Sequence, residues 1–380
     1  MKKVGVITHY YKSLNYGGNF QAFALVKFLR DNGFEAEQIP YDRSNDWPFS
    51  KSRAGLLKKL KRLLGKKKSR NVSVELSEAE LDGLEKRKKA ISDFNNGIPH
   101  SRVFEKRTLN DLSSGFDAFV VGSDQVWHPK AVCSAYMLDF DAGSAKKVSY
   151  AASFAVDEIP DEAVPYYKRC LSSFDAISVR EKSGIEIVNS LVGRDAVCTV
   201  DPTLLLPRAE LEKVCEPIEL PKKYVFCYFL SPCTAGRRSA SEYSRSDENI
   251  KIVTLPYVCD KLCGEDADFG DVRLFDVSPG QLLTVIKNAD AVFTDSFHMT
   301  VFSLIFEKEF FTFGRTDYSD MGSRLQTLLS MFDAENRFFG AASEDEIDFG
   351  KLQKLNYDRN FEEYEKAVRE SVAFLKVGLN

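Results

Sequence analysis

The chain has 380 residues, a hydrophobic content of 44% and a formal net charge of −4. This length and apolar content suffice for two or three globular domains, each with its own core. The charge gives no sign of a nucleic-acid binder, and no apolar stretch approaches the roughly 20 residues that span a bilayer. Residues 3–8 predict a β-strand rather than a secretory signal peptide, so we expect a cytoplasmic protein.

Strand-like apolar runs alternate with helical patterns, which favours an α/β fold with largely parallel sheets. In the first half the pattern predicts strands near 3–8, 117–121, 147–151, 175–180 and 196–200, and helices near 19–32, 78–96, 161–173 and 182–191. After Pro217 and Pro221 the alternation restarts, with strands near 223–230, 250–255, 271–275, 290–294 and 310–313. Two doubly wound domains facing each other would hold a ligand between them.

We therefore predict an N-terminal domain over 1–207 and a C-terminal domain over 218–350. In the remaining segment, 351–380, a helix near 358–377 is expected to pack back on the first domain. Residues 43–100 interrupt the first domain. Within them, 51–70 holds ten Lys or Arg and no acid, with leucines at helical spacing. Such a helix could lie on the inner face of a membrane, or it could be a solvated insertion whose leucines cover a small satellite core.

The eight cysteines stand mostly in apolar surroundings, where a reduced Cys behaves as a small hydrophobe. Their spacings, including the step from Cys259 to Cys263, match no zinc or iron–sulfur pattern. Only four histidines are available for mixed sites. We therefore expect no metal.

Two polar turns follow strands of the first domain. Gly17 and Gly18, after the strand at 3–8, allow close approach of a ligand, although the turn is neither G-x-G-x-x-G nor a P-loop and could be only a tight turn. After 117–121, Ser123, Asp124 and Gln125 can hydrogen-bond a polyhydroxylated ligand, and Trp127 could stack on it. Asp124 is the candidate general base, the alternative being a helix N-cap.

Two arginines are candidates for binding an anion. Arg180 ends an apolar strand, and its guanidinium fork suits a phosphate or a carboxylate. A salt bridge to Glu181 or to another acid is the structural alternative. Arg324 opens a helix after the strand at 310–313 and would bring a second cation from the other domain.

The segment 294–300 combines the end of a buried strand, a polar turn and the start of a helix. His298 in the first helical turn would stand among unpaired backbone N–H groups, an arrangement suited to an anion beside a proton-transfer group. Alternatively, Asp295 or Ser296 only caps the helix and His298 is a half-buried surface residue. A Ser-His-Asp triad with Ser296 and Asp124 is disfavoured because no G-x-S-x-G motif exposes a nucleophile.

Five motifs, in this order and at these separations, resemble those of the polysaccharide pyruvyl transferase family: N-Y-G-G-N-F-Q-A (15–22), V-G-S-D-Q-V-W (121–127), S-V-R-E-K (178–182), D-P-T-L-L (201–205) and T-D-S-F-H-M-T-V-F-S (294–303). The resemblance covers nearly the whole chain except 43–100. It implies two Rossmann-like domains in a glycosyltransferase-B-like arrangement, with the active site in the cleft between them. It also implies transfer of pyruvate from phosphoenolpyruvate onto a sugar of a polysaccharide precursor as a cyclic ketal, without a metal or an organic cofactor.

The resemblance makes His298 the family histidine at the donor site and Arg180 the arginine that binds the donor's anionic groups. Where some members have Arg-Leu-His, this chain has Ser296-Phe297-His298, and a methionine replaces the glycine usual after the histidine. A donor-binding cation is therefore missing. Either Arg324 replaces it or the donor sits differently.

The mechanism we expect has two proton-transfer groups, His298 as the acid and Asp124 as the base that accepts the proton of the attacking hydroxyl. The N-terminal domain is expected on the acceptor side, and the acceptor-binding residues are Asn15, Gly17, Gly18, Gln21, Ser123, Gln125 and Trp127. The C-terminal domain is expected on the donor side, and the donor-binding residues are Arg180, Ser296, Phe297 and Arg324. The sequence leaves open whether the acceptor is nucleotide-linked or lipid-linked. Two other functions remain open: a nucleotide-sugar glycosyltransferase on the same fold, and a non-catalytic protein that binds a sugar or an anion.

Overall fold

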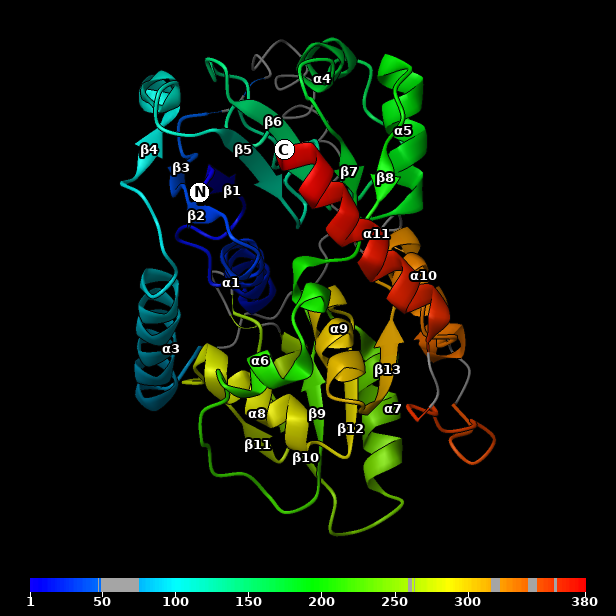
Figure 1. The fold of residues 1–380 in the computed structure, drawn as a ribbon. Coiled ribbons are helices and arrows are strands. Elements are labelled where there is room, and N and C mark those ends of the chain that lie inside the picture. The colour runs from blue at the N-terminus through cyan, green and yellow to red at the C-terminus, as the bar shows by residue number, and fades with distance from the viewer. Residues whose placement is uncertain are drawn as a thin grey trace, which may run out of the picture.

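The computed structural model describes residues 1–46, 48, 75–258, 262, 264–315, 322–340, 347–358 and 361–380. The basic segment 51–70 and the pair Cys259 and Cys263 lie outside the described residues, so both interpretations of that segment stay predictions. Figure 1 shows two α/β units, one above the other, with α1 between them and α9 against the second sheet. None of the described helices combines the length and the apolarity that a membrane crossing requires.

The first sheet is parallel and has the order β2-β1-β5-β6. Its strands are β1 (Lys3–Ile7), β2 (Glu35–Gln38), β5 (Ala118–Gly122) and β6 (Lys146–Tyr150). Single parallel bridges join β6 and the residues after it to the region of β7 (Ser178–Val179), which pairs with β8 (Val197–Cys198). At the other edge, a bridge from Gln38 leads to the pair β3 (Tyr41–Asp42) and β4 (Phe104–Glu105).

The second sheet is also parallel and has the order β11-β10-β9-β12-β13-β14. Its strands are β9 (Tyr224–Tyr228), β10 (Lys251–Thr254), β11 (Val272–Arg273), β12 (Ala291–Thr294), β13 (Glu309–Phe313) and β14 (Phe338–Phe339). Counted within the domain, this is the doubly wound order 3-2-1-4-5-6, whose ligands lie where the order reverses, beside the carboxyl ends of β9 and β12. The predicted α/β class with parallel sheets is confirmed.

The helices flank these sheets. They are α1 (Tyr16–Asp31), α3 (Glu78–Asn96), α4 (Val164–Leu171), α5 (Lys182–Val192), α6 (Arg208–Glu212), α7 (Thr234–Ser244), α8 (Pro279–Asn288), α9 (Phe297–Ile305), α10 (Gly322–Ser330) and α11 (Glu362–Leu379). Helix α1 begins earlier than predicted, because Asn15 accepts a hydrogen bond from the Gly17 N–H and starts the helix there. The predicted glycine turn is therefore the first turn of α1.

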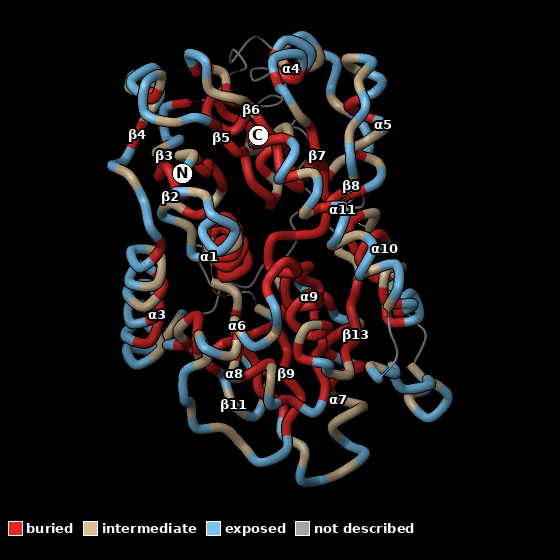
Figure 2. The backbone as a smooth tube through the Cα atoms, in the orientation of Figure 1, coloured by how far each residue is buried: buried red, intermediate tan, exposed pale blue. Residues whose placement is uncertain are grey.

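Buried contacts join the two domains beneath the site. Phe20 of α1 meets Phe302 of α9 edge to face, with ring centroids 5.1 Å apart. The Tyr16 hydroxyl donates to the carbonyl of Val277 at 2.6 Å. Figure 2 shows the facing parts of α1 and α9 in the buried colour. The first turns of these two helices are consequently held against each other by a shared core.

Two further helices bridge the domains. Helix α3 lies beside the second domain (Figure 1), where its buried Arg87 donates to the carbonyls of Pro256, Leu274 and Phe275. Helix α11 runs back from the second domain and contacts β6. Its Ser371 hydroxyl accepts from the Val200 N–H at 3.0 Å. These contacts fix the relative position of the strand ends that carry the site.

Candidate active site

The polar turns identified in the sequence meet at the boundary between the domains. Ser123 and Asp124 follow β5, Arg180 follows β7, and the segment 295–298 follows β12. In both sheets these are carboxyl ends of parallel strands, the usual place for ligands in such folds. The first turn of α1 completes the group, because Gly17 lies directly against the His298 side chain.

Arg180 is 3% exposed and is held by acids other than the one next to it. Its Nη1 donates to Asp201 Oδ2 at 3.1 Å and to Ser123 Oγ at 3.4 Å, and Nη2 lies 4.0 Å from Asp124 Oδ1. Glu181 instead accepts at Oε1 from the Ser153 hydroxyl and from two backbone N–H groups. Among the described residues, Nε and Nη2 of Arg180 have no hydrogen-bond partner.

Asp201 is the hub of this cluster, and it was not predicted as a site residue. It accepts at Oδ1 from the N–H and hydroxyl of Thr203, and at Oδ2 from Ser123 and Arg180. Its Oδ2 also lies 3.5 Å from His298 Nε2. Burial acts to raise the pKa of Asp201, but His298, Arg180 and the Thr203 hydrogen bond outweigh burial and hold that pKa far below its usual range.

His298 comes from the second domain but is enclosed by the first. It is 6% exposed, and its Nε2 has no hydrogen-bond partner among the described residues. A methyl group placed on Gly17 would overlap the imidazole and its Cβ, so only glycine leaves room for this side chain. The 3.5 Å separation from Asp201 exceeds a normal hydrogen bond, which leaves Nε2 available to contact a ligand.

The start of α9 has no side-chain cap. Ser296 occupies the N-cap position without such a bond. Asp295 instead accepts from the Leu230 N–H at 2.6 Å and from the Ser231 N–H at 3.0 Å, tying the turn after β12 to the turn after β9. The first N–H groups of a helix have no intrahelical partner, so this uncapped end favours an anion.

Arg324 is the second cation of the site and is 4% exposed on α10. The ring centroid of Phe297 lies 4.3 Å from Arg180 Cζ and 5.7 Å from Arg324 Cζ. Gln125 accepts from both Nη atoms of Arg324 at 3.1 Å when its amide oxygen faces the guanidinium. Among the described residues no carboxylate forms an ion pair with Arg324, and its Nε has no partner. Burial and the charge of Arg180 lower the pKa of Arg324 to about 9.

Asp124 is buried and caps no helix in the structure. Its φ of 67° lies in the left-handed region, and its Oδ1 accepts from the Gln125 N–H at 2.8 Å. Burial acts to raise its pKa, but His298, Arg180 and His9 outweigh burial and lower it. A methyl group on Gly18 would lie 3.2 Å from Asp124 Oδ2 and still closer to the His9 carbonyl. Asp124 is therefore an ionised carboxylate between two histidines.

Two histidines beside the cluster were missed in the sequence. His9 lies two residues after the end of β1, and burial lowers its pKa although Asp124 acts to raise it. His128 accepts at Nδ1 from the Lys130 N–H at 3.0 Å, and its pKa is lowered to about 4 by burial and by the charges of Lys130 and Arg324. The position of His9 at a strand end is the signal that would have identified it.

The acceptor-side prediction is wrong for Trp127. This side chain is 0% exposed, its indole N–H donates to the Tyr136 carbonyl, and its ring packs against Phe154 and Phe174. It belongs to the core and offers no face to a sugar. Gln21 is also fully buried, where its amide donates to Thr8 Oγ1 and to the Gly18 carbonyl. It therefore supports the turn rather than facing a ligand.

The other residues predicted on the acceptor side lie at the domain boundary. Ser123 is fully buried and donates to Asp201 at 2.7 Å, whereas Asn15 is exposed and caps α1. Gln125 is partly buried beside Arg324. In the described residues, no group of three or more His, Cys, Asp or Glu side chains is arranged to hold a metal ion. The absence of a metal from the reaction stays a prediction.

Comparison with known proteins identifies the family and the fold. The family model described as polysaccharide pyruvyl transferase matches residues 15–318. A solved UDP-N-acetylglucosamine 2-epimerase is 11% identical, with a TM-score of 0.50 over 97% of this chain and 90% of that one. The corresponding enzyme from Rickettsia bellii is 12% identical, with a TM-score of 0.47 over 100% and 97% of the two chains. None of the curated proteins matches significantly.

The likeness to the solved structures concerns the fold alone. The expected pair of Rossmann-like domains in a glycosyltransferase-B-like arrangement is confirmed by the topology of the two sheets and by this likeness. The family match spans the turns that carry Arg180, Asp201 and His298. The chain belongs to the polysaccharide pyruvyl transferase family and is a transferase.

Proposed function

We propose that this protein transfers pyruvate from phosphoenolpyruvate onto two hydroxyls of a sugar in a polysaccharide precursor, closing a cyclic ketal. The observation that carries the proposal is the pair Arg180 and Arg324, two buried cations from opposite domains beside the ring of Phe297. Their unpartnered N–H groups suit an anion with more than one acidic group. Phosphoenolpyruvate carries a carboxylate and a phosphate ester on the same carbon.

The uncapped start of α9 adds fixed dipoles for the same anion. Ser296, which stands where some relatives have arginine, contributes a neutral hydroxyl at the N-cap. We therefore assign the missing positive charge to Arg324, which reaches the site from α10. The donor would lie between Arg180 and Arg324, with its methylene carbon toward His298.

The reaction we propose begins with transfer of a proton from the His298 imidazole to the methylene carbon. The adjacent carbon becomes oxocarbenium-like, and a first sugar hydroxyl bonds to it while Asp124 takes the hydroxyl proton. A second hydroxyl then attacks the same carbon, its bond to the phosphate oxygen breaks, and the phosphate leaves with the second proton. Solvent returns a proton to His298 and removes one from Asp124, which balances the reaction. The roles of these two groups are those of a general acid and a general base.

Incubation of the full chain with phosphoenolpyruvate and a panel of candidate sugars tests the proposal. Release of inorganic phosphate that depends on a sugar, together with a new ketal methyl signal in the NMR spectrum of the product, is the expected result. Release of a nucleoside diphosphate from sugar nucleotides, with phosphoenolpyruvate untouched, would identify a glycosyltransferase instead. Saturable binding of phosphoenolpyruvate without turnover on any sugar would indicate a non-catalytic protein.

The contact between Gly17 and His298 gives a more specific prediction. Gly17→Ala should displace the imidazole and lower turnover by about 10²-fold, because small misplacements of a catalytic group are costly. Steady-state assays would measure the loss. Gly378→Ala is the matched control, because Gly378 is also a helical glycine, in α11. A methyl group added there would make only ordinary contacts, the nearest 3.4 Å from the Ala176 Cβ. Equal activity of the two variants would contradict the placement of His298.

A further inference from the structure

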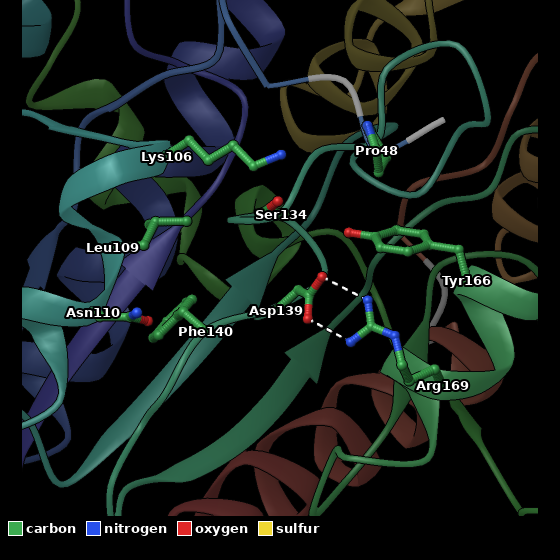
Figure 3. Close-up of a pocket in the computed structure, with 9 residues that line it drawn as sticks. All are labelled: Pro48, Lys106, Leu109, Asn110, Ser134, Asp139, Phe140, Tyr166 and Arg169. Atoms are coloured by element: carbon green, nitrogen blue, oxygen red, sulfur yellow. Dashed lines mark hydrogen bonds and ion pairs between the residues drawn. The ribbon is translucent and has the colours of Figure 1, made fainter. Parts of the chain in front are cut away.

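A polar cavity lies on the first domain, and none of the residues of the Arg180 cluster lines it. It has a volume of about 320 Å³, and its polar lining comes from Lys106, Asn110, Ser134, Asp139, Tyr166 and Arg169. Figure 3 shows these side chains around one space, with Phe140 and Leu109 on one side of it. This volume is at the small end for ligand sites, which suits one sugar ring better than a sugar nucleotide.

The charges around this cavity are balanced. Arg169 donates to both carboxylate oxygens of Asp139, at 2.7 and 2.8 Å (Figure 3). Lys106 pairs at 3.1 Å with Asp46, whose carboxylate also accepts from the N–H and hydroxyl of Ser134. Each of these two cations therefore has its own acid, whereas Arg324 of the candidate active site has none among the described residues. Among the described residues of the lining, an anion would find no uncompensated charge, whereas a neutral ligand would meet fixed donors and acceptors.

The polar and aromatic groups that line this cavity suit the hydroxyls and the apolar face of a sugar ring. The fork between Arg169 and Asp139 offers charged hydrogen-bonding atoms in fixed positions, and Asn110 adds an amide. Arg169 Cζ lies 5.3 Å from the centroid of the Tyr166 ring, which orders both side chains. Aromatic rings beside a few fixed polar groups are typical of small-molecule sites.

One connecting segment, 123–140, builds both the candidate active site and this cavity. It starts at Ser123 and Asp124 and ends with Asp139 and Phe140 in the cavity lining. Midway, the ring centroid of Tyr136 lies 6.4 Å from that of His9, which interacts with Asp124. The cavity is thus built by the domain to which we assign the acceptor.

We propose that this cavity binds a neutral sugar residue of the acceptor, a different residue from the one that receives pyruvate. The assignment to the acceptor rests on the proposed function, whereas binding of a neutral sugar by the cavity does not. The role of the cavity is to select acceptors whose sugar chain carries this additional neutral residue. Binding energy gained at this distance from the chemistry would lower KM for the longer acceptor without changing turnover.

Saturation-transfer NMR on the full chain, with methyl hexosides and neutral disaccharides as probes, tests the proposal. Asn110→Ala and Arg169→Ala each remove lining groups and should weaken sugar binding about tenfold. Arg102→Ala is the matched control: Arg102 also pairs with an aspartate and lies over a ring, but it does not line the cavity. Binding should be unchanged in Arg102→Ala and in Arg324→Met.

Several results would overturn the assignment. The first is that no probe binds saturably up to roughly ten millimolar. The second is that inorganic phosphate displaces a bound sugar. The third is that sugar binding is lost in Arg324→Met but kept in both cavity variants. The proposed function is tested separately, by measuring the release of inorganic phosphate. Turnover of phosphoenolpyruvate without sugar binding at the cavity refutes only the cavity, and sugar binding without turnover refutes only the transferase chemistry.

Discussion

His298→Ala is expected to lower the rate of pyruvyl transfer by about 10²- to 10⁴-fold, the usual contribution of a general acid. Donor binding and folding should persist, because Arg180 and Arg324 remain in place and Asp201 keeps its hydrogen bonds from Ser123, Thr203 and Arg180. Single-turnover assays with saturating phosphoenolpyruvate would measure the chemical step, and calorimetry would measure donor affinity.

His100→Ala is the control for this experiment. His100 is an exposed histidine on the first domain whose ring contacts only the nearby Ile98 carbonyl among the hydrogen bonds of the described residues. It should transfer pyruvate at the rate of the unmodified protein. Near-native turnover in His298→Ala would show that the proton comes from another group, and His9 would then be the next residue to test because it also adjoins Asp124.

Much of the fold was predictable because the central strands are continuous apolar runs. All five residues of β5 and of β9 are buried, so both strands read clearly in the sequence. The strands that were not predicted are short and lie at sheet edges, such as β3 and β14 with two residues each. Two residues cannot establish a periodic pattern, and their pairing depends on neighbours far away in the sequence.

The site was predictable to the extent that it lies at strand ends. Parallel strands bring their carboxyl ends to one edge, so Asp124 and Arg180 could be expected to meet. Asp201 was missed because its importance arises from three partners that are distant in sequence or come from the other domain. Trp127 was misassigned because a tryptophan after a polar turn has the same sequence signal whether it faces a ligand or the core.

The largest effect on donor binding is expected from Arg324→Met, which removes a buried cation and keeps most of the side-chain volume. Losing a charge-assisted hydrogen bond, worth about 1.5–3 kcal/mol, should weaken phosphoenolpyruvate binding roughly 10- to 150-fold. The free protein should nevertheless become no less stable, and we expect a higher unfolding temperature. Calorimetry and thermal unfolding without the donor would measure the two changes.

Arg324→Met is expected to weaken donor binding but to raise stability because of the environment of Arg324. Because its pKa is lowered, the folded chain holds that proton less tightly than the unfolded chain, so the charged guanidinium costs stability throughout the pH range below about 9. This cost from Arg324 should shrink as the pH increases above that value. Arg324→Met removes this cost and also the repulsion from Arg180. A lower unfolding temperature in Arg324→Met would contradict this account.

Arg180→Met is the matched comparison and should lower both the affinity for the donor and the stability of the free protein. It removes a donor-binding cation, but it also leaves Asp201 without its arginine in a buried site, a change that costs about 3–5 kcal/mol for a typical buried pair. Bound phosphoenolpyruvate should raise the unfolding temperature of the unmodified protein, because it binds only the folded state. That increase should shrink in both variants. Of the two arginines, only Arg180 is expected to stabilise the fold. Stability without the donor therefore distinguishes Arg180, which holds Asp201 in place, from Arg324, which is expected to act only in donor binding.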